Sequence, residues 1–338
     1  MSTQSVPPVA VTMGDPAGIG GDIILRAWLE HRDTMPPFFA IDDPGRLSSL
    51  ALRLKLECSI QTISSGGEAQ DHFSKALPVL PINKLLISPS QPGTPNSENS
   101  HAVIGAIDQA VELTRSGEAS ALVTNPIHKA SLQEIGFSFP GHTEYLGHLA
   151  GSGTNSVMML TGGGLRVVPV TVHMALRDAV TALTSDAIVR CGMVTAAALK
   201  TDFGIREPRL AVAALNPHAG EDGNFGTEEV DIISPAISRL SELGACIKGP
   251  FPADTLFHKD ARQTYDAVLC MYHDQALIPL KTLDFYGGVN VTLGLPFIRT
   301  SPDHGTAFDV AGTGTARCDS LVSAIRLAAN IAGTRRRG

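Results

Sequence analysis

Three histidines in this sequence each follow an apolar run that is typical of a buried β-strand. The runs and their histidines are Leu165–Val172 with His173, Leu210–Leu215 with His218, and Ala267–Tyr272 with His273. Neutral imidazole is the commonest protein ligand for divalent transition metals, and three imidazoles with one open position are typical of a catalytic metal site. In α/β folds, residues at the carboxyl ends of strands converge on the ligand crevice. The triplet therefore predicts a metal-dependent enzyme that acts on a small molecule.

Two other classes of protein stay open at this point, because the histidine spacing matches no short zinc motif. One is a metal-dependent hydrolase, in which the imidazoles activate water and no nicotinamide cofactor is needed. The other is a non-catalytic small-molecule binding protein or sensor, in which each histidine is a separate hydrogen-bonded loop residue. An assay for NADH formation tests the first alternative, and metal analysis tests the second.

Two further clusters have side chains suited to an anionic ligand. In the first, His142 and Thr143 place an imidazole beside a hydroxyl. The second follows His273 and contains two cations, one carboxylate and one amide; its members are Asp274, Lys281, Asn290 and Arg299. Cations flanked by an amide donor suit a phosphate or a carboxylate, although each could also be an exposed surface charge.

A glycine-rich segment, Gly14–Gly21, lies where a dinucleotide fingerprint would be expected. If Gly18 and Gly20 are its first two glycines, Ile23 stands where the third should be, and the Lys-Ser/Thr ending of a P-loop is absent. The glycines either allow close backbone packing in a tight turn or contact a ligand. In either case the segment argues against an ordinary Rossmann domain.

An irregular run from Ser301 to Gly312 is rich in Gly, Thr, Asp and His. Such a run can present backbone amides and hydroxyls to a nucleotide. It resembles the loop of isopropylmalate and isocitrate dehydrogenases that holds the adenosine half of NAD(P). We therefore assign cofactor binding to His304, Gly305, Thr306, Asp309 and Gly312.

Strand-like and helical segments alternate along the chain, which predicts a mostly parallel sheet with crossover helices. The clearest expected strands are Val9–Met13, Ser120–Thr124 and Ala267–Met271, with a hairpin of Val157–Leu160 and Leu165–Val172. The clearest expected helices are Gly21–His31, Glu228–Leu243 and Ser320–Ala332. We expect Pro78–Ser100, which is rich in Pro, Ser and Asn, to be an extended surface connection.

The composition of the 338 residues limits the kinds of partner and the cellular compartment that we expect for this chain. The net charge of −7 argues against a nucleic-acid partner, because phosphate contacts need clustered Lys and Arg. No apolar stretch has the length of a membrane span, and the N-terminus lacks the pattern of a signal peptide. The five cysteines form no C-x-x-C pair and are typical of reduced thiols. We expect a cytoplasmic protein that does not bind membranes.

Six motifs, found in order, resemble the 4-hydroxythreonine-4-phosphate dehydrogenase family of pyridoxal 5′-phosphate biosynthesis. They are Val11–Gly20, Gly141–Glu144, Thr171–Asp178, Leu215–Glu221, Gly249–Thr255 and Tyr272–Gln275, and the resemblance extends from Val9 to Ala332. It implies two α/β/α domains with a cleft between them, like isocitrate and isopropylmalate dehydrogenases. By analogy, residues 1–140 and 290–338 would form the cofactor domain. Residues 141–289 would form the domain of metal ligands and dimerisation.

The resemblance also implies roles for individual residues. His173, His218 and His273 match the family's metal ligands, with the site at a homodimer interface and the third histidine supplied by the partner chain. The positions that match substrate-contacting or nearby acidic residues are His142, Thr143, Asp254, Lys281, Asn290 and Arg299. Asp274 and Lys281 are candidates for catalysis. Zinc suits three imidazoles, while magnesium, manganese or cobalt could replace it.

The reaction implied by the resemblance is a metal-assisted oxidation of a hydroxyl-bearing carbon. NAD or NADP would accept the hydride from 4-phosphohydroxy-L-threonine. The resulting β-keto acid would lose carbon dioxide to give 3-amino-2-oxopropyl phosphate. The alternative within the same fold is a dehydrogenase of another hydroxy acid or of a dihydrodiol carboxylate. A phosphate cradle formed by Lys281, Asn290 and Arg299 would distinguish the two.

Overall fold

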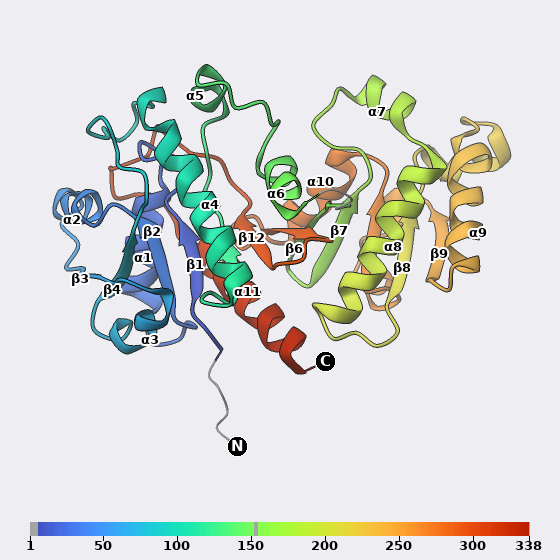
Figure 1. The fold of residues 1–338 in the computed structure, drawn as a ribbon. Coiled ribbons are helices and arrows are strands. Elements are labelled where there is room, and N and C mark those ends of the chain that lie inside the picture. The colour runs from blue at the N-terminus through green and yellow to red at the C-terminus, as the bar shows by residue number, and fades with distance from the viewer. Residues whose placement is uncertain (1–5, 152–154, 338) are drawn as a thin grey trace. The chain divides into compact units, whose positions relative to one another are not determined.

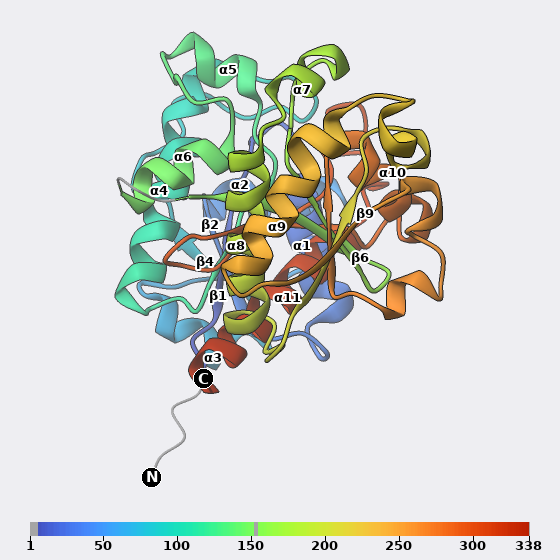
Figure 2. The same cartoon turned by 90° about the vertical axis from the view of Figure 1, so that its right-hand side faces the viewer.

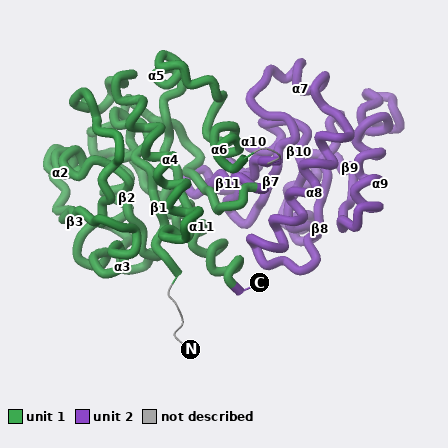
Figure 3. The backbone as a smooth tube through the Cα atoms, viewed as in Figure 1, with its two compact units in different colours: residues 1–152, 295–336 green, residues 153–294, 337–338 purple. Residues whose placement is uncertain are grey.

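The computed structural model describes residues 6–151 and 155–337. The chain forms two compact units (Figure 3). Unit 1 contains residues 1–152 and 295–336, and unit 2 contains residues 153–294 and 337–338. We expected the domains to change near residues 140 and 290, and the units change at 152/153 and 294/295. The domain roles and the cleft between the domains stay predictions.

The sheet of unit 1 has its strands in the order β3-β4-β2-β1-β5-β12, and each neighbouring pair is parallel. The bounds are β1 Val9–Thr12, β2 Phe38–Asp42, β3 Ile60–Thr62, β4 Leu77–Pro81, β5 Leu122–Val123 and β12 Arg299–Pro302. Strands β1 and β2 are buried along their whole length, as expected for strands covered on both faces.

Helices alternate with these strands along the chain (Figure 1). They are α1 Gly20–His31, α2 Pro44–Arg53, α3 Ala69–His72, α4 Ser100–Ser116, α5 Lys129–Glu134, α6 His142–Ala150 and α11 Asp319–Arg337. Local signals define several ends. The Asp43 side chain accepts a hydrogen bond from the Arg46 amide at the start of α2, and Pro44 follows at the first helical position. Helix α4 ends at Gly117, which has a left-handed φ of 84°.

The sheet of unit 2 has the strand order β11-β6-β7-β10-β8-β9. Strand β6 is antiparallel to both β7 and β11, whereas β7, β10, β8 and β9 are parallel to one another. The bounds are β6 Val157–Gly162, β7 Leu165–Pro169, β8 Arg209–Ala213, β9 Cys246–Phe251, β10 Ala267–Cys270 and β11 Val289–Leu293. The α/β class and the mostly parallel sheet predicted from the sequence are confirmed.

The helices of unit 2 are α7 Leu176–Ala182, α8 Ser185–Thr201, α9 Ser234–Glu242 and α10 His273–Leu283. Helices α8 and α9 lie side by side, and both contact strands of the unit 2 sheet (Figure 2). Among the described residues, no single helix is both long and apolar enough to span a membrane. The pair α7 and α8 reaches that length and composition together, but is bent by 89°.

One expectation about elements is wrong. The segment Pro78–Ser100 is not an extended connection throughout, because Leu77–Pro81 forms β4, which pairs with β2 and β3. Burial of β4 between its neighbouring strands outweighs the local Pro and Ser content. The helix expected over Glu228–Leu243 is confirmed: its first turn, Glu229–Ile233, is π-helical, and it continues as α9, Ser234–Glu242.

Candidate active site

The three histidines of the sequence prediction lie beyond the carboxyl ends of three adjacent strands in unit 2. The strands are β7, β10 and β8, which are neighbours in that order and parallel. His173 follows β7, His273 begins α10 after β10, and His218 follows β8. Because parallel strands end at the same edge of a sheet, all three histidine-bearing segments start from one edge.

Buried polar side chains connect these three segments. The Thr171 hydroxyl, two residues before His173, donates to the carbonyl of Met271 (2.8 Å). The Met271 amide donates to Oε1 of Gln275 (2.7 Å), and Nε2 of Gln275 donates to the carbonyl of Ala214 (2.6 Å) at the end of β8. Thr171 and Gln275 are both buried. The network fixes the backbone from which the imidazoles project.

His173 and His273 lie together in a pocket of about 360 Å³ in unit 2. Their ring centroids are 5.9 Å apart. Nδ1 of His273 lies 2.7 Å from Oδ1 of Asp274, so the carboxylate accepts a hydrogen bond from Nδ1–H, and the neutral ring keeps the lone pair of Nε2 available for a ligand. An imidazole oriented by a carboxylate in this way is typical of a metal ligand.

His218 does not line that pocket, and the centroid of its ring lies 6.1 Å from the ring centroid of Phe225. Across residues 6–151 and 155–337, the three imidazoles do not form a group whose ligating atoms all lie within 4.8 Å of one another. The structure therefore brings together two of the three predicted ligands and places the third on the adjacent segment. The complete metal site stays a prediction.

The backbone around His218 is unusual. Four non-glycine residues, His218, Ala219, Glu221 and Asp222, have φ between 43° and 56°, in the left-handed region. That conformation costs roughly 1–2 kcal/mol per residue. It is held by buried Glu229, whose Oε1 accepts hydrogen bonds from two backbone amides at the start of the turn, those of Leu215 and Asn216 (both 2.8 Å). Strain that is maintained by neighbouring contacts is often found at functional sites.

In unit 1, His142 and Thr143 begin helix α6, and Arg299 begins strand β12. Arg299 is only 3% exposed, and its guanidinium donates to the Thr124 hydroxyl (Nε 3.1 Å, Nη2 2.7 Å). Burial lowers the pKa of Arg299 to about 10, so it is a cation at neutral pH. Burial, together with the charges of Arg299 and Lys129, lowers the pKa of His142 well below 6.5. His142 is therefore a neutral imidazole near two cations.

Two residues in this part of unit 1 were missed by the sequence prediction. Lys129, the first residue of α5, influences His142 and lies beside Gly141. Asn125 is fully buried, donates from Nδ2 to the Thr12 carbonyl (2.9 Å), and within the described part of the chain its Oδ1 has no hydrogen-bond partner. Asn125 follows strand β5 just as the histidines follow theirs, and that signal could have identified it.

The remaining predicted substrate and catalytic residues belong to unit 2. Nζ of Lys281, on α10, lies 5.4 Å from the ring centroid of Phe285. Asn290 lies on β11, and its buried Oδ1 has no hydrogen-bond partner among the residues described. Asp254 and Asp274 are exposed. The predicted phosphate cradle therefore divides between unit 2 (Lys281, Asn290) and unit 1 (Arg299), and it stays a prediction.

The predicted cofactor loop, residues 304–312, packs against the glycine-rich segment within unit 1. The Ile19 amide donates to the Thr306 carbonyl (3.0 Å), and the Gly312 amide donates to Oδ1 of Asp22 (2.9 Å). In the same loop Nδ1 of His304 lies 3.1 Å from the Gly305 carbonyl oxygen. Gly305 and Asp309 are exposed.

The structure gives the glycine-rich segment a packing role. A Cβ atom on Gly20 would lie 2.3 Å from the carbonyl oxygen of Met13, and one on Gly14 would lie 2.7 Å from that of Pro126. Gly14 also has a φ of +70°. Any side chain at these two positions would collide with backbone, so the tight-turn interpretation holds for them.

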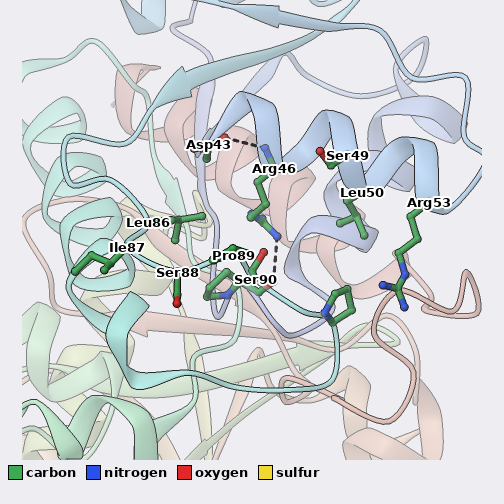
Figure 4. Close-up of a pocket in the computed structure, with 12 residues that line it drawn as sticks. Asp43, Arg46, Ser49, Leu50, Arg53, Leu86, Ile87, Ser88, Pro89 and Ser90 are labelled. Atoms are coloured by element: carbon green, nitrogen blue, oxygen red, sulfur yellow. Dashed lines mark hydrogen bonds between the residues drawn. The ribbon is translucent and has the colours of Figure 1, made fainter.

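A pocket of about 510 Å³ lies beside the cofactor loop in unit 1 (Figure 4). Arg53, on its wall, donates from Nε to the Gly312 carbonyl (3.4 Å). Arg46 makes a two-point ion pair with Asp42 (2.9 and 2.5 Å) and also donates to the Pro16 carbonyl. The Arg46 guanidinium is therefore engaged in hydrogen bonds within the protein, and Arg53 is the cation that is more accessible to a ligand in this pocket.

Comparison with known proteins supports the family resemblance found in the sequence. A family model described as "Pyridoxal phosphate biosynthetic protein PdxA" matches residues 34–328. A 4-hydroxythreonine-4-phosphate dehydrogenase of Caulobacter vibrioides is 54% identical over 97% of this chain and 98% of its own. The crystal structure of the Klebsiella pneumoniae 4-hydroxythreonine-4-phosphate dehydrogenase is similar, with a TM-score of 0.86, 38% identity and coverage of 96% and 99%. A terephthalate 1,2-cis-dihydrodiol dehydrogenase of Burkholderia xenovorans is more distant, with a TM-score of 0.63, 26% identity and coverage of 96% and 98%.

Proposed function

Because this chain belongs to the PdxA family of pyridoxal phosphate biosynthetic proteins, we propose that it uses a bound divalent metal and NAD(P) to oxidise 4-phosphohydroxy-L-threonine. It is an enzyme of the oxidoreductase class, which sets aside the hydrolase and sensor alternatives. The observation that supports the metal is the placement of three imidazoles beyond the carboxyl ends of adjacent parallel strands.

The donor set in unit 2 fits a divalent transition metal. His173 and His273 share a pocket, and Asp274 leaves Nε2 of His273 available as a ligand. His218 is the third ligand in this proposal. When bound, the metal ion lowers the pKa of the substrate hydroxyl and so favours its deprotonation. Zinc suits three imidazoles best, with cobalt, manganese or magnesium as alternatives.

The charges of unit 1 support recognition of an anionic substrate. Arg299 and Lys129 are cations, and their charges help to keep His142 neutral. The neutral imidazole ring can donate one hydrogen bond and accept another. We assign an anionic group of the substrate to Arg299, and a further substrate contact to Thr143, which follows His142 at the start of α6. Lys281, Asn290 and Asp254 of unit 2 complete the proposed substrate contacts.

Asp274 and Lys281 are the candidates for moving the hydroxyl proton. Asp274 is exposed and contacts His273, so it can pass a proton to solvent. Lys281 is on the same helix, α10, two turns further along. With NAD(P) held at residues 304–312, the cofactor would accept the hydride from the hydroxyl-bearing carbon, and the hydroxyl proton would be released. The β-keto acid then loses carbon dioxide to give 3-amino-2-oxopropyl phosphate.

The cofactor in this proposal is NAD or NADP, bound at residues 304–312. The support is that this loop packs on the start of α1 and has exposed positions at Gly305 and Asp309. A helix N-terminus suits the anionic pyrophosphate of such a cofactor. The pocket next to Arg53 leaves room for such a ligand.

The proposal includes a homodimer whose interface contains the metal site. Large apolar side chains are exposed on and beside α7 and α10: Met174, Leu176, Ile278, Leu283, Phe285 and Tyr286. Met174 and Leu176 also line the histidine pocket. A grouped set of exposed apolar side chains is typical of a protein interface. A cytoplasmic location also belongs to the proposal, since all five cysteines are free thiols.

The second candidate is a dehydrogenase of a non-phosphorylated dihydrodiol carboxylate, favoured by the fold shared with the Burkholderia xenovorans enzyme. The deciding experiment measures NADH formation with 4-phosphohydroxy-L-threonine and with 4-hydroxy-L-threonine, which lacks the phosphate. The proposal predicts turnover of the first and at least about 100-fold lower kcat/KM for the second, because an ionic phosphate contact contributes several kcal/mol. Equal turnover of both compounds would favour the second candidate.

A further inference from the structure

A separate cluster of metal-binding side chains lies in unit 1, on elements that carry none of the predicted site residues. Glu30 and His31 are the last two residues of α1, and Cys318 directly precedes α11. One ligating atom from each of the three lies within 4.8 Å of the other two. The cluster combines a thiol, an imidazole and a carboxylate, which are the three donor types that zinc uses in proteins.

The spacing of the donor atoms fits one metal ion. The Cys318 sulfur lies 3.8 Å from Oε2 of Glu30. A tetrahedral zinc ion, with Zn–S and Zn–O bonds of roughly 2.3 and 2.1 Å, separates two such ligand atoms by about 3.6 Å. Without an ion, the same contact is only a weak S–H hydrogen bond. The atoms are therefore already placed for shared coordination.

A neighbouring cation orients the Glu30 carboxylate. Arg26 binds the other carboxylate oxygen of Glu30, Oε1, at 3.0 Å and also donates to the Gly314 carbonyl. This contact turns Oε2 toward the sulfur. Arg317, next to Cys318 in the chain, pairs with Asp319 (3.1 Å).

The burial of the three side chains suits a site that can be filled from solvent. Cys318 is 4% exposed, His31 is partly buried, and the Glu30 side chain is 44% exposed. An ion can therefore enter past Glu30, and water can occupy the fourth position. The sulfur ligand on the inner side favours zinc and other thiophilic ions over calcium or magnesium.

We propose that Glu30, His31 and Cys318 form a second metal site that binds one zinc ion or a related thiophilic divalent ion. The ion connects the end of the first helix of unit 1 to the start of its last helix. Because such a site exists only in the folded chain, binding stabilises unit 1. The site is independent of the three histidines of unit 2, which offer no sulfur ligand.

Cobalt(II) added to the metal-depleted full-length protein tests the proposal, because a thiolate bound to cobalt produces a charge-transfer band in the near ultraviolet. We expect this band in the wild type and in His218→Ala, and its loss in Cys318→Ser. Cys246→Ser is the matched control, since Cys246 is an exposed thiol in unit 2 and its removal should leave the band unchanged. A wild-type protein without the band, or a band that survives Cys318→Ser, overturns the proposal.

A second variant protects the test against a folding defect in Cys318→Ser. His31 lies at a helix end, so His31→Gln should fold normally, which far-ultraviolet circular dichroism and the unfolding midpoint without metal will check. We expect its affinity for zinc at the sulfur site, measured by competition with a chromogenic chelator in the His218→Ala background, to fall at least about tenfold. An unchanged affinity shows that His31 is not a ligand and contradicts the proposed site.

Discussion

At the scale of single residues, His142 illustrates how burial and charge set a protonation state. Its imidazole is enclosed, Nε2 has no hydrogen-bond partner within the described part of the chain, and the cations Arg299 and Lys129 lie near it. Each of these conditions disfavours the imidazolium form. A neutral ring at this position can orient a substrate oxygen without adding a third positive charge.

The lowered pKa of His142 predicts a pH dependence of stability. Below pH 6.5 the unfolded chain binds a proton at this residue that the folded chain excludes, so the free energy of unfolding decreases as the pH falls through this range. His142→Gln should make that decrease shallower, as measured by urea unfolding on both sides of pH 6.5. The exposed His101→Gln is the matched control and should keep the wild-type slope. Identical slopes for all three proteins would show that His142 is not held neutral by the fold.

The sequence was informative for residues that follow strands and uninformative for residues that act through distant contacts. His173, His218 and His273 were found because each ends an apolar run, and the strands before them are the adjacent β7, β8 and β10. Glu229 and the Glu30–Cys318 pair gave no such signal. Glu229 lies 13 or 14 residues from the amides it binds, and Cys318 lies 288 residues from Glu30.

At the scale of elements, the left-handed turn at His218 depends on Glu229 from the π-helical turn that precedes α9. Glu229→Gln should lower the free energy of unfolding by about 2 kcal/mol, because one buried carboxylate currently accepts two backbone hydrogen bonds. Metal affinity of the histidine site should fall about tenfold, as for other residues that orient ligands. Urea unfolding and chelator competition in the Cys318→Ser background measure the two effects.

The neighbouring glutamate provides the control for this prediction. Within residues 6–151 and 155–337, Glu228 accepts a hydrogen bond only from the side chain of Asn216 (2.7 Å), so Glu228→Gln should leave both the stability and the metal affinity near wild type. If the two variants behave alike, Glu229 does not position the His218 turn. Rescue of metal affinity by Glu229→Asp is not expected, because the shorter side chain cannot reach both amides.

The element scale also shows where local composition fails. The residues Pro78–Pro81 lie in a segment whose Pro and Ser content is typical of loops, yet they belong to β4. Strand β4 pairs with β2 and β3, and its first four residues are buried. Burial of these residues in the sheet outweighs their low strand propensity, and a single sequence does not reveal such burial in advance.

At the scale of the whole molecule, the proposed homodimer predicts the effect of a charge on the exposed apolar surface of unit 2. Ile278, on α10, is 65% exposed. Ile278→Glu should convert a dimer into monomers and reduce turnover with it, as measured by sedimentation velocity and NADH formation. Leu52→Glu, at an 80% exposed position on α2 in unit 1, should remain dimeric and active. A wild-type protein that sediments as a monomer while fully active would exclude the dimeric site.

The central claim is that His173, His218 and His273 together hold one divalent ion on which the oxidation depends. The most direct test measures NADH formation from 4-phosphohydroxy-L-threonine after exhaustive chelation and again after zinc, cobalt or magnesium is restored. It is carried out with wild type, Cys318→Ser and His218→Ala. We predict at least about a 100-fold loss on chelation, with recovery in the first two proteins but not in His218→Ala. Full turnover by the chelated wild-type enzyme would contradict the account.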